Sequence, residues 1–249
     1  MKLSKGDIQT ALIDADIMLY RAAWKHEGDD IENAYETIDA MFEHIFYVTK
    51  CVSYIGFLTG RLNFRKEIAK TKPYKGNRKD MPMPEHFDDI REYLIENWKC
   101  EVVNGMEADD ALGICQTEMD KTVICSIDKD LLQVQGYHYN WNKNEISFIS
   151  EYDAWHKLYS QTLSGDSTDN IMGIPRVGEK KAKKILEECF DERDAFVVSL
   201  NAYSNFYTES EDVAMELFKE NRDLVHICTS SKDKRLKFEF EKPEVNFVF

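Results

Sequence analysis

Carboxylate side chains gather in four short segments of this 249-residue chain. The segments read DAD at 14–16, EADD at 107–110, DKD at 128–130 and DSTD at 166–169. One such pair alone is more simply explained as a helix cap or a turn, but four groups on separate elements favour a shared cation site. Oxygen ligands without a Cys or His set are typical of Mg²⁺ or Mn²⁺ rather than zinc. We therefore expect hard divalent cations among these carboxylates.

Two clusters of basic residues lie close to the acidic segments, in a chain whose formal net charge is -14. A single lysine run is most simply a solvated face, but two clusters beside ordered carboxylates favour phosphate binding. Divalent cations next to Lys and Arg suit phosphodiester hydrolysis, so we expect nucleic-acid hydrolysis. The clusters are Arg61, Arg65, Lys66, Lys70, Lys72, Lys75, Arg78 and Lys79, and then Arg176, Lys180, Lys181, Lys183 and Lys184.

The elements that must position these residues alternate between strand and helix up to about residue 152, and the pattern is mainly helical afterwards. This order predicts an α/β fold with a parallel-type central sheet flanked by helices. The segments 14–16 and 128–130 follow strands, so they should meet at the carboxyl edge of the sheet. We expect strands at 8–13, 52–58, 100–103 and 122–127, helices at 33–50, at 85–98 and from 107, and a loose tail or a last edge strand at 239–249.

The remaining composition narrows the class of protein. The six cysteines contain no C-x-x-C pair and are expected to be reduced core thiols, and the six histidines are expected to be structural or surface residues. No apolar run approaches the roughly 20 residues that a bilayer span needs, and no apolar segment follows residues 1–7 as in a secretion signal. We expect a cytoplasmic protein.

Five motifs stand in one order along residues 8–190. In this order they resemble the structure-specific 5′ nuclease family of flap endonucleases and 5′-3′ exonucleases, especially its phage-type members and the 5′ nuclease domain of bacterial DNA polymerase I. The resemblance implies a PIN-like nuclease core over 1–155 with a helical arch over 61–84. It also implies a helical DNA-binding region over 156–249 that contains a helix-three-turn-helix at 164–190. The motifs are LIDADIMLYRA (12–22), FRKEIAKTKPYKGNRK (64–79), GMEADDALG (105–113), SIDKDLLQ (126–133) and SGDSTDNIMGIPRVGEKKAKKIL (164–186).

The resemblance also implies a metal-ligand set. Asp14 matches a ligand at the end of the first strand, and 107–110 matches an acidic helix start that serves the more tightly held metal group. The segments 128–130 and 166–169 match the second group, whereas the family often has another residue at Asp16. The ligands implied for two or more Mg²⁺ ions, for which Mn²⁺ can substitute, are Asp14, Glu107, Asp109, Asp110, Asp128, Asp130, Asp166 and Asp169.

Basic and aromatic positions of the motifs imply how DNA is held. Lys75 and Arg78 match residues that contact the scissile phosphate, and Tyr20 matches an aromatic that stacks on the base beside the cut. The glycine turn at 173–178 and the lysines after it resemble a phosphate-binding hairpin, which in the family holds a potassium ion. Besides the catalytic Lys75 and Arg78, the implied DNA-binding residues are Tyr20, Arg65, Lys66, Tyr74, Lys79, Gly173, Arg176, Gly178, Lys180, Lys181 and Lys184.

The partner that follows from the resemblance is DNA with free 5′ ends, flaps or nicks, and the family is mostly monomeric. The sequence leaves open whether exonuclease or flap endonuclease activity dominates and whether RNA-DNA hybrids are cut. A phage-encoded member would act in the host cytoplasm. Because the arch segment is rich in like charges, we expect it to have little fixed structure until DNA binds.

One position departs from the family pattern. The family has an aspartate at the end of its second strand, where this chain has Gly60 after Thr59. No nearby carboxylate in the sequence replaces it. Water could fill the ligand position, or the chain could be a weakened member or carry a lesion that traps substrate. We expect metal binding to survive, turnover to be reduced, and a Gly60→Asp reversion to raise turnover.

Two other functions are open. A haloacid-dehalogenase-like phosphatase also uses a D-x-D after its first strand, a strand-end serine such as Ser126, and a motif similar to 165–169. That alternative leaves the EADD segment, the basic arch and the glycine-lysine hairpin unexplained. The second alternative, favoured by Gly60, is a catalytically silent protein that binds branched DNA.

Overall fold

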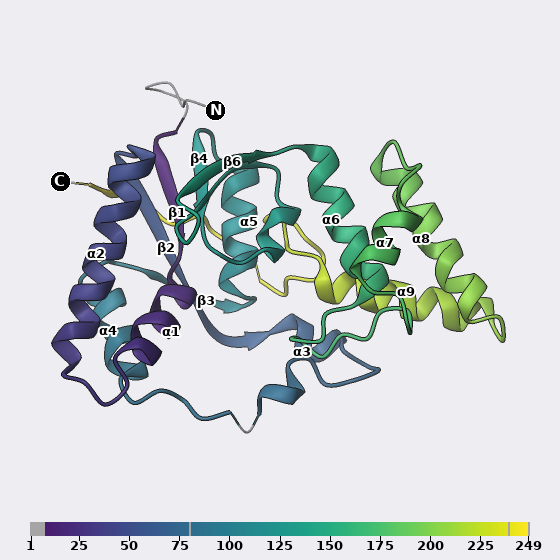
Figure 1. The fold of residues 1–249 in the computed structure, drawn as a ribbon, viewed down its shortest axis with the longest axis horizontal. Coiled ribbons are helices and arrows are strands. Elements are labelled where there is room, and N and C mark those ends of the chain that lie inside the picture. Colours follow the sequence, from purple (N-terminus) through teal and green to yellow (C-terminus); the bar gives the residue numbers. More distant parts are fainter. Residues whose placement is uncertain (1–7, 80, 239, 249) are drawn as a thin grey trace. The chain divides into compact units, whose positions relative to one another are not determined.

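The computed structural model describes residues 8–79, 81–238 and 240–248, and the chain divides into two compact units (Figure 1). Unit 1 contains Met1–Leu62, Pro82–Ile149 and Cys228–Phe249. Unit 2 contains Asn63–Met81 and Ser150–Ile227. Residues 1–7, where the sequence predicts no secretion signal, lie outside the described residues.

Within the described residues, unit 1 is built on a seven-stranded sheet. Its strands are β1 (Thr10–Asp14), β2 (Ser53–Asn63), β3 (Glu101–Gly105), β4 (Thr122–Cys125), β5 (Gly136–Asn140), β6 (Glu145–Ile149) and β7 (Asn246–Phe247). The strand order is β3-β2-β1-β4-β5-β6, and β7 pairs with β2 outside this order. β1 is parallel to β2 and β4, and β4 is parallel to β5, whereas β6 and β7 are antiparallel to their partners.

The central strands β1 and β4 carry apolar residues at most of their positions, as strands covered on both faces do. Every residue of β1 and of β4 is buried. The helices of unit 1 are α1 (Ala15–Lys25), α2 (Ile31–Thr49), α4 (Phe87–Glu96) and α5 (Ala108–Glu118). The first three pack together beside the sheet, and α5 packs on β1, β3 and β4 (Figure 1). Parallel strands with helical connections therefore bring the ends of β1, β2 and β4 to one edge.

Unit 2 is helical. Its helices are α3 (Phe64–Ile68), α6 (Glu151–Ser164), α7 (Glu179–Ile185), α8 (Glu192–Phe206) and α9 (Glu211–Val225), with a short 3₁₀ turn, η1 (Gly76–Arg78). A core that includes Leu163, Tyr203 and Phe218 holds α6, α8 and α9 together. The buried Tyr203 hydroxyl donates to the Thr162 carbonyl at 2.6 Å and accepts from the Asn221 amide at 2.8 Å.

The predicted α/β class is confirmed, with a mostly parallel sheet flanked by helices. Each of the expected strands and helices exists, with bounds that shift by a few residues. The sequence did not predict α1, β5 or β6. Of the two alternatives for 239–249, the edge strand is found in part, because Asn246–Phe247 pairs with β2, while residues 239 and 249 lie outside the described part.

The chain is divided differently from the expected boundary at 155. Residues 63–81 belong to unit 2, and 228–249 return to unit 1. The arch segment, for which the charge pattern predicts little fixed structure without DNA, contains α3 and η1, while Asp80 lies outside the described residues. Within unit 2, Glu220 accepts hydrogen bonds from the Lys70 and Thr71 amides at 2.7 Å, which helps to fix this segment.

All six cysteines are buried and none forms a disulfide, in agreement with core thiols. Burial raises the pKa of the Cys115 thiol to about 12. Among the residues that the structure describes, no helix combines the length and the apolarity of a membrane span.

Candidate active site

Asp14 ends β1 at the carboxyl edge of the sheet, and only 2% of it is exposed. The Ser126 hydroxyl donates to Asp14 Oδ2 at 2.6 Å and accepts from the Asp128 amide at 2.9 Å. Burial raises the pKa of Asp14 to about 7, the Ser126 hydrogen bond lowers it, and the charges of Asp16 and Asp128 raise it further. A cation at this place would favour the charged carboxylate.

Asp16 lies one residue inside α1, and its carboxylate reaches β2 at Thr59, four residues before that strand ends. Both of its oxygens accept from the Thr59 amide, at 3.0 and 3.2 Å. Burial raises the pKa of Asp16, hydrogen bonds from Thr59 and the Arg91 charge lower it, and the charge of Glu107 raises it. The Thr59 hydroxyl also accepts from the Ala108 amide at 2.9 Å, so one residue of β2 contacts both Asp16 and the start of α5. Asp16 therefore supplies a carboxylate near the place where the family pattern requires one.

Gly60 marks a close approach between β2 and β3. A Cβ atom at this position would lie 2.6 Å from the Val103 carbonyl oxygen and 2.5 Å from Asn104 Oδ1. The same Asn104 oxygen accepts from the Arg61 amide at 2.8 Å. With the strands in this arrangement, an aspartate at position 60 does not fit without a shift of backbone.

The acidic start of α5 forms a capping box, in which the Glu107 and Asp110 side chains each pair with the backbone of the other. Asp110 is fully buried, and its two oxygens accept from the Glu107 amide at 3.1 Å and the Cys228 amide at 2.9 Å. Asp109, the next helical position, is half-buried. Asp110 thus holds the helix start together, whereas Glu107 and Asp109 are more accessible.

Asp128 and Asp130 follow β4 and are both half-buried. The Asp130 amide donates to Asp128 Oδ1 at 2.7 Å. Asp128 also influences Asp14 electrostatically, as expected for carboxylates at neighbouring strand ends. The ends of β1 and β4 therefore bring the first and third acidic segments together within unit 1.

The carboxylates divide between the two units: six of the implied ligands lie in unit 1, and Asp166 and Asp169 lie in unit 2. Their oxygen-only donor chemistry fits hard divalent cations. Within the described residues, however, no three Asp, Glu, His or Cys side chains are arranged to hold an ion. Some of these carboxylates instead accept hydrogen bonds from backbone amides, as Asp16 and Asp110 do.

Lys75 and Arg78, which the motif implies contact the scissile phosphate, lie in unit 2 beside an acidic turn. Arg78 Nη2 is 2.7 Å from Asp169 Oδ1, and Lys75 Nζ is 3.8 Å from Asp169 Oδ2. Asp166 Oδ1 accepts from the Thr168 amide at 2.7 Å and the Asp169 amide at 3.4 Å, so it closes its own turn.

The other predicted DNA-contacting residues of the arch segment fall into two groups. Lys66 and Lys79 are exposed. Arg65 is 2% exposed, and its guanidinium donates to the Leu224 and His226 carbonyls, each at 2.9 Å. Tyr74 is 6% exposed and packs in the core of unit 2. The placement of Arg65 and Tyr74 indicates structural roles and does not support direct DNA contact.

Tyr20 in unit 1 is 42% exposed, and its ring centroid lies 5.1 Å from that of Phe87.

In unit 2, the glycine turn before α7 is built on a close backbone approach. Gly173 has φ +59, and a Cβ atom there would lie 2.2 Å from the Gly165 nitrogen. Of the predicted DNA-binding residues in the turn and α7, Gly173 is buried, whereas Arg176, Gly178, Lys180, Lys181 and Lys184 are exposed.

Sequence reasoning missed the residues that orient these carboxylates. Ser126 directly follows β4 and Thr59 lies within β2, and each donates a hydrogen bond to an aspartate that is distant in sequence. Glu220 of α9 holds the arch segment. The signal for Ser126 was its position at the end of an apolar strand. Glu220 carried no signal, since its contact with Thr71 spans 149 residues.

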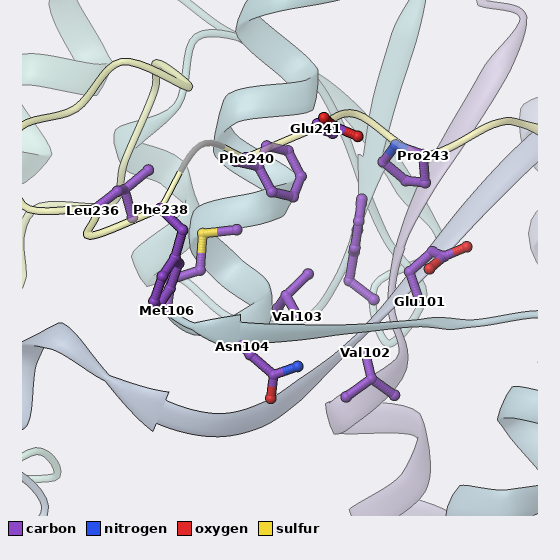
Figure 2. Close-up of a pocket in the computed structure, with 11 residues that line it drawn as sticks. Glu101, Val102, Val103, Asn104, Met106, Leu236, Phe238, Phe240, Glu241 and Pro243 are labelled. Carbon is purple, nitrogen blue, oxygen red and sulfur yellow. The ribbon is translucent and has the colours of Figure 1, made fainter.

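A cavity of about 190 Å³ in unit 1 lies apart from this chemistry (Figure 2). Val103 of β3 points toward Phe240 of the C-terminal segment, whereas Asn104 points to the opposite side of the strand (Figure 2). The lining is mainly apolar and includes Phe57, Met106 and Phe238. Its described residues include none of the predicted ligands, so we place the candidate active site at the strand ends.

Comparison with known proteins agrees with this fold. The exodeoxyribonuclease of Enterobacteria phage T3 is 32% identical over 130 residues, which cover 49% of this chain but only 42% of the phage protein. The 5′-3′ exonuclease of Mycoplasmopsis pulmonis is 29% identical, with 92% of this chain and 83% of that protein covered. A solved complex of the bacteriophage T5 flap endonuclease with DNA and metal ions has a TM-score of 0.60 at 15% identity, over 87% of this chain and 89% of that chain. The family model of the 5′-3′ exonuclease N-terminal, resolvase-like domain matches residues 9–159, and the chain therefore belongs to the 5′-3′ exonuclease family.

Proposed function

We propose that the protein hydrolyses phosphodiester bonds of DNA at or near free 5′ ends, as a 5′-3′ exonuclease or flap endonuclease. The observation that carries this proposal is the grouping of Asp14 at the end of β1, Asp16 at the start of α1 and Asp128 after β4 within one unit. Buried acidic groups that influence one another at the carboxyl edge of a parallel sheet are typical of a catalytic site. The names of the relatives support DNA as the substrate.

Within unit 1, the ligand set that we propose for two or more divalent cations comprises the six implied carboxylates of that unit together with Asp16. Mg²⁺ is the expected ion and Mn²⁺ a substitute, because every donor is a carboxylate oxygen. Bound divalent cations would lower the pKa of a water and stabilise negative charge on phosphate oxygens. Ser126 would keep Asp14 oriented while its charge is neutralised, and Thr59 would do the same for Asp16.

Phosphate and DNA binding would use the exposed cations of unit 2. Lys75 and Arg78 would neutralise the scissile phosphate, and the lysines of α7 would screen the duplex backbone without reading sequence. The backbone at Gly178, where no atom lies within 4 Å of a Cβ position, is open to approach by phosphate, and a K⁺ ion at the turn is part of the proposal. Tyr20 would stack on a base, because its ring is partly exposed to solvent.

The partner would be DNA with flaps, nicks or free 5′ ends, with RNA-DNA hybrids as a second substrate to test. We propose a monomer that acts in the cytoplasm, or in the host cytoplasm if a phage encodes it. A nuclease core over 1–155 and a DNA-binding region over 156–249 remain the proposed division of labour.

The test uses a 5′-labelled single-flap duplex in Mg²⁺, in Mn²⁺ and in EDTA, with Asp14→Asn as the matched inactive variant. We expect metal-dependent products near the junction for the native chain, and a loss of at least about 100-fold for the variant, because a buried ligand charge is removed. Calorimetry with Mn²⁺ in the absence of DNA would measure ion binding separately. Binding of the flap with no product in either metal would contradict the proposal and favour the silent branched-DNA binder.

A further inference from the structure

The base of the arch segment is fastened to an acidic turn within unit 2. We call residues 73–78 (PYKGNR) the clamp segment and residues 166–170 (DSTDN) the acidic turn. Both belong to the same compact unit. Side-chain and backbone hydrogen bonds join them along their whole length, so the order of the clamp segment depends on the acidic turn.

The Asp169 carboxylate is the centre of these contacts. Its Oδ1 accepts from Arg78 Nη2 at 2.7 Å, and its Oδ2 accepts from the Tyr74 hydroxyl at 2.8 Å. Lys75 Nζ is 3.8 Å from the same Oδ2. The Asp169 side chain is 19% exposed and that of Arg78 is 40% exposed, so this ion pair is only partly withdrawn from water. One carboxylate thus contacts both cations assigned to the scissile phosphate.

The backbone reinforces this arrangement. The Lys75 amide donates to the Asp169 carbonyl at 2.9 Å, and Arg78 Nε donates to the Thr168 carbonyl at 3.1 Å. In return, the Asn170 amide side chain donates to the Pro73 carbonyl at 2.9 Å. Lys75 and Asn170 both have positive φ, at 53° and 63°. Such conformations cost free energy in non-glycine residues and persist where surrounding contacts stabilise them.

Tyr74 connects the carboxylate to the interior. Its ring is buried in the core that includes Leu163, Ile171 and Ile174, and only its hydroxyl reaches the acidic turn. The aromatic ring therefore fixes the clamp segment, and the hydroxyl at its tip fixes Asp169. Asp166 differs, because its carboxylate accepts hydrogen bonds from amides of its own turn.

We infer that Asp169 is a positioning residue, which holds Lys75 and Arg78 in place for phosphate before DNA binds. Long basic side chains lose much rotamer entropy when they are fixed, and a preorganised pair avoids that cost on binding. This role differs from the metal-ligand role that the family motif implies for Asp169. That Lys75 and Arg78 then bind phosphate rests on the proposed function, whereas their positioning by Asp169 does not.

The first experiment is limited trypsin digestion of the full chain in EDTA without DNA, with cleavage after Lys75 and Arg78 followed separately by mass spectrometry. We expect Asp169→Asn to raise both cleavage rates at least about fivefold, because both ion pairs lose their charge. Asp166→Asn is the matched control and should leave the rates within about twofold, since an amide oxygen can still accept from Thr168. Tyr74→Phe, which removes one hydroxyl, should give an intermediate increase. Unchanged cleavage in Asp169→Asn would overturn the inference.

The second experiment is a double-mutant cycle on single-turnover flap cleavage with Asp169→Asn and Arg78→Met. If Asp169 acts through Arg78, the double variant should be within about threefold of Asp169→Asn alone. If the losses of cleavage rate in the two single variants multiply in the double variant, and Asp169→Asn binds Mn²⁺ more weakly in calorimetry, Asp169 would act only as a metal ligand. That result would overturn the inference. The two proposals can fail separately. If the native chain does not cleave DNA, but its clamp segment resists trypsin and Asp169→Asn removes that resistance, the proposed function fails and this inference stands.

Discussion

At position 60 the family pattern suggests a lost metal ligand, but the close approach of β2 and β3 requires a residue without a Cβ atom. We expect Gly60→Asp to lower the free energy of unfolding by about 1–3 kcal/mol, because the new Cβ would meet the Val103 carbonyl oxygen at 2.6 Å. Urea denaturation in EDTA would measure the loss. Gly178→Asp is the matched control, since no atom lies within 4 Å of a Cβ there and aspartate is favoured at a helix N-cap.

An equally stable Gly60→Asp variant would contradict this account of β2 and β3. The expectation that reversion raises turnover would then be testable without interference from folding. If the variant is destabilised, the carboxylate of Asp16 beside Thr59 is the better candidate for the missing ligand. Mn²⁺ affinity of Asp16→Asn, which keeps an acceptor for the Thr59 amide, would decide its role.

His138 makes a pH-dependent contribution to stability. It is buried, its Nε2 donates to the Val134 carbonyl at 2.8 Å, and burial lowers its pKa to about 4 from 6.5. The unfolded chain therefore binds more protons between these values, and stability falls as pH falls through 6.5 toward 4. We expect the stability of the native chain relative to His138→Gln to drop by up to about 3 kcal/mol over this range. Urea midpoints at pH 7.5 and 4.5 would show it, and a constant difference would contradict it.

The candidate site could be predicted from residue type and position, but its internal partners could not. Asp14 and Asp128 follow apolar strands, and that local pattern is visible in the sequence. The Ser126 bond to Asp14 joins residues 112 apart, and its existence depends on the pairing of β1 with β4. The burial of Tyr74 and Arg65 was also invisible, because both types occur in DNA-binding surfaces and in cores.

At the scale of elements, α3 and α9 are joined by a buried cation. We expect Arg65→Lys to destabilise unit 2 by about 2–4 kcal/mol, because lysine cannot reproduce the donors to Leu224 and His226 and would be buried unpaired. Thermal unfolding followed by circular dichroism would measure this. Lys66→Met, at an exposed neighbouring position, should have little effect. If Arg65→Lys is as stable as the native chain but binds DNA more weakly, the predicted DNA contact of Arg65 would be supported instead.

Elements with strong periodicity or continuous burial were predictable, whereas short polar ones were not. β1 and β4 each contain three consecutive apolar residues and are buried at every position, as central parallel strands are. β6 alternates polar and apolar residues over 145–148 only and has no buried residue, so its signal is weaker. It exists because β5 provides an antiparallel partner for it.

At the scale of the whole molecule, a net charge of -14 opposes DNA, and local cations must overcome it. We expect binding of a flap duplex in EDTA to weaken steeply with salt. Replacing Lys180, Lys181 and Lys184 by Gln should reduce the slope of log affinity against log salt by about 0.9 for each phosphate that these lysines neutralise in the native chain. The control replaces the exposed Lys99, Lys143 and Lys219 by Gln and should keep the slope. Equal changes in both triple variants would assign the effect to net charge alone.

Neither unit is continuous along the chain, because residues 63–81 complete unit 2 from within the stretch that otherwise builds unit 1. This interleaving limits how the protein can be rearranged by recombination or by protein engineering. A single crossover between two related genes would pair unit 2 helices from one parent with a clamp segment from the other. Chimaeras should therefore work only when residues 63–81 and 150–227 are exchanged together, as one cassette in two pieces.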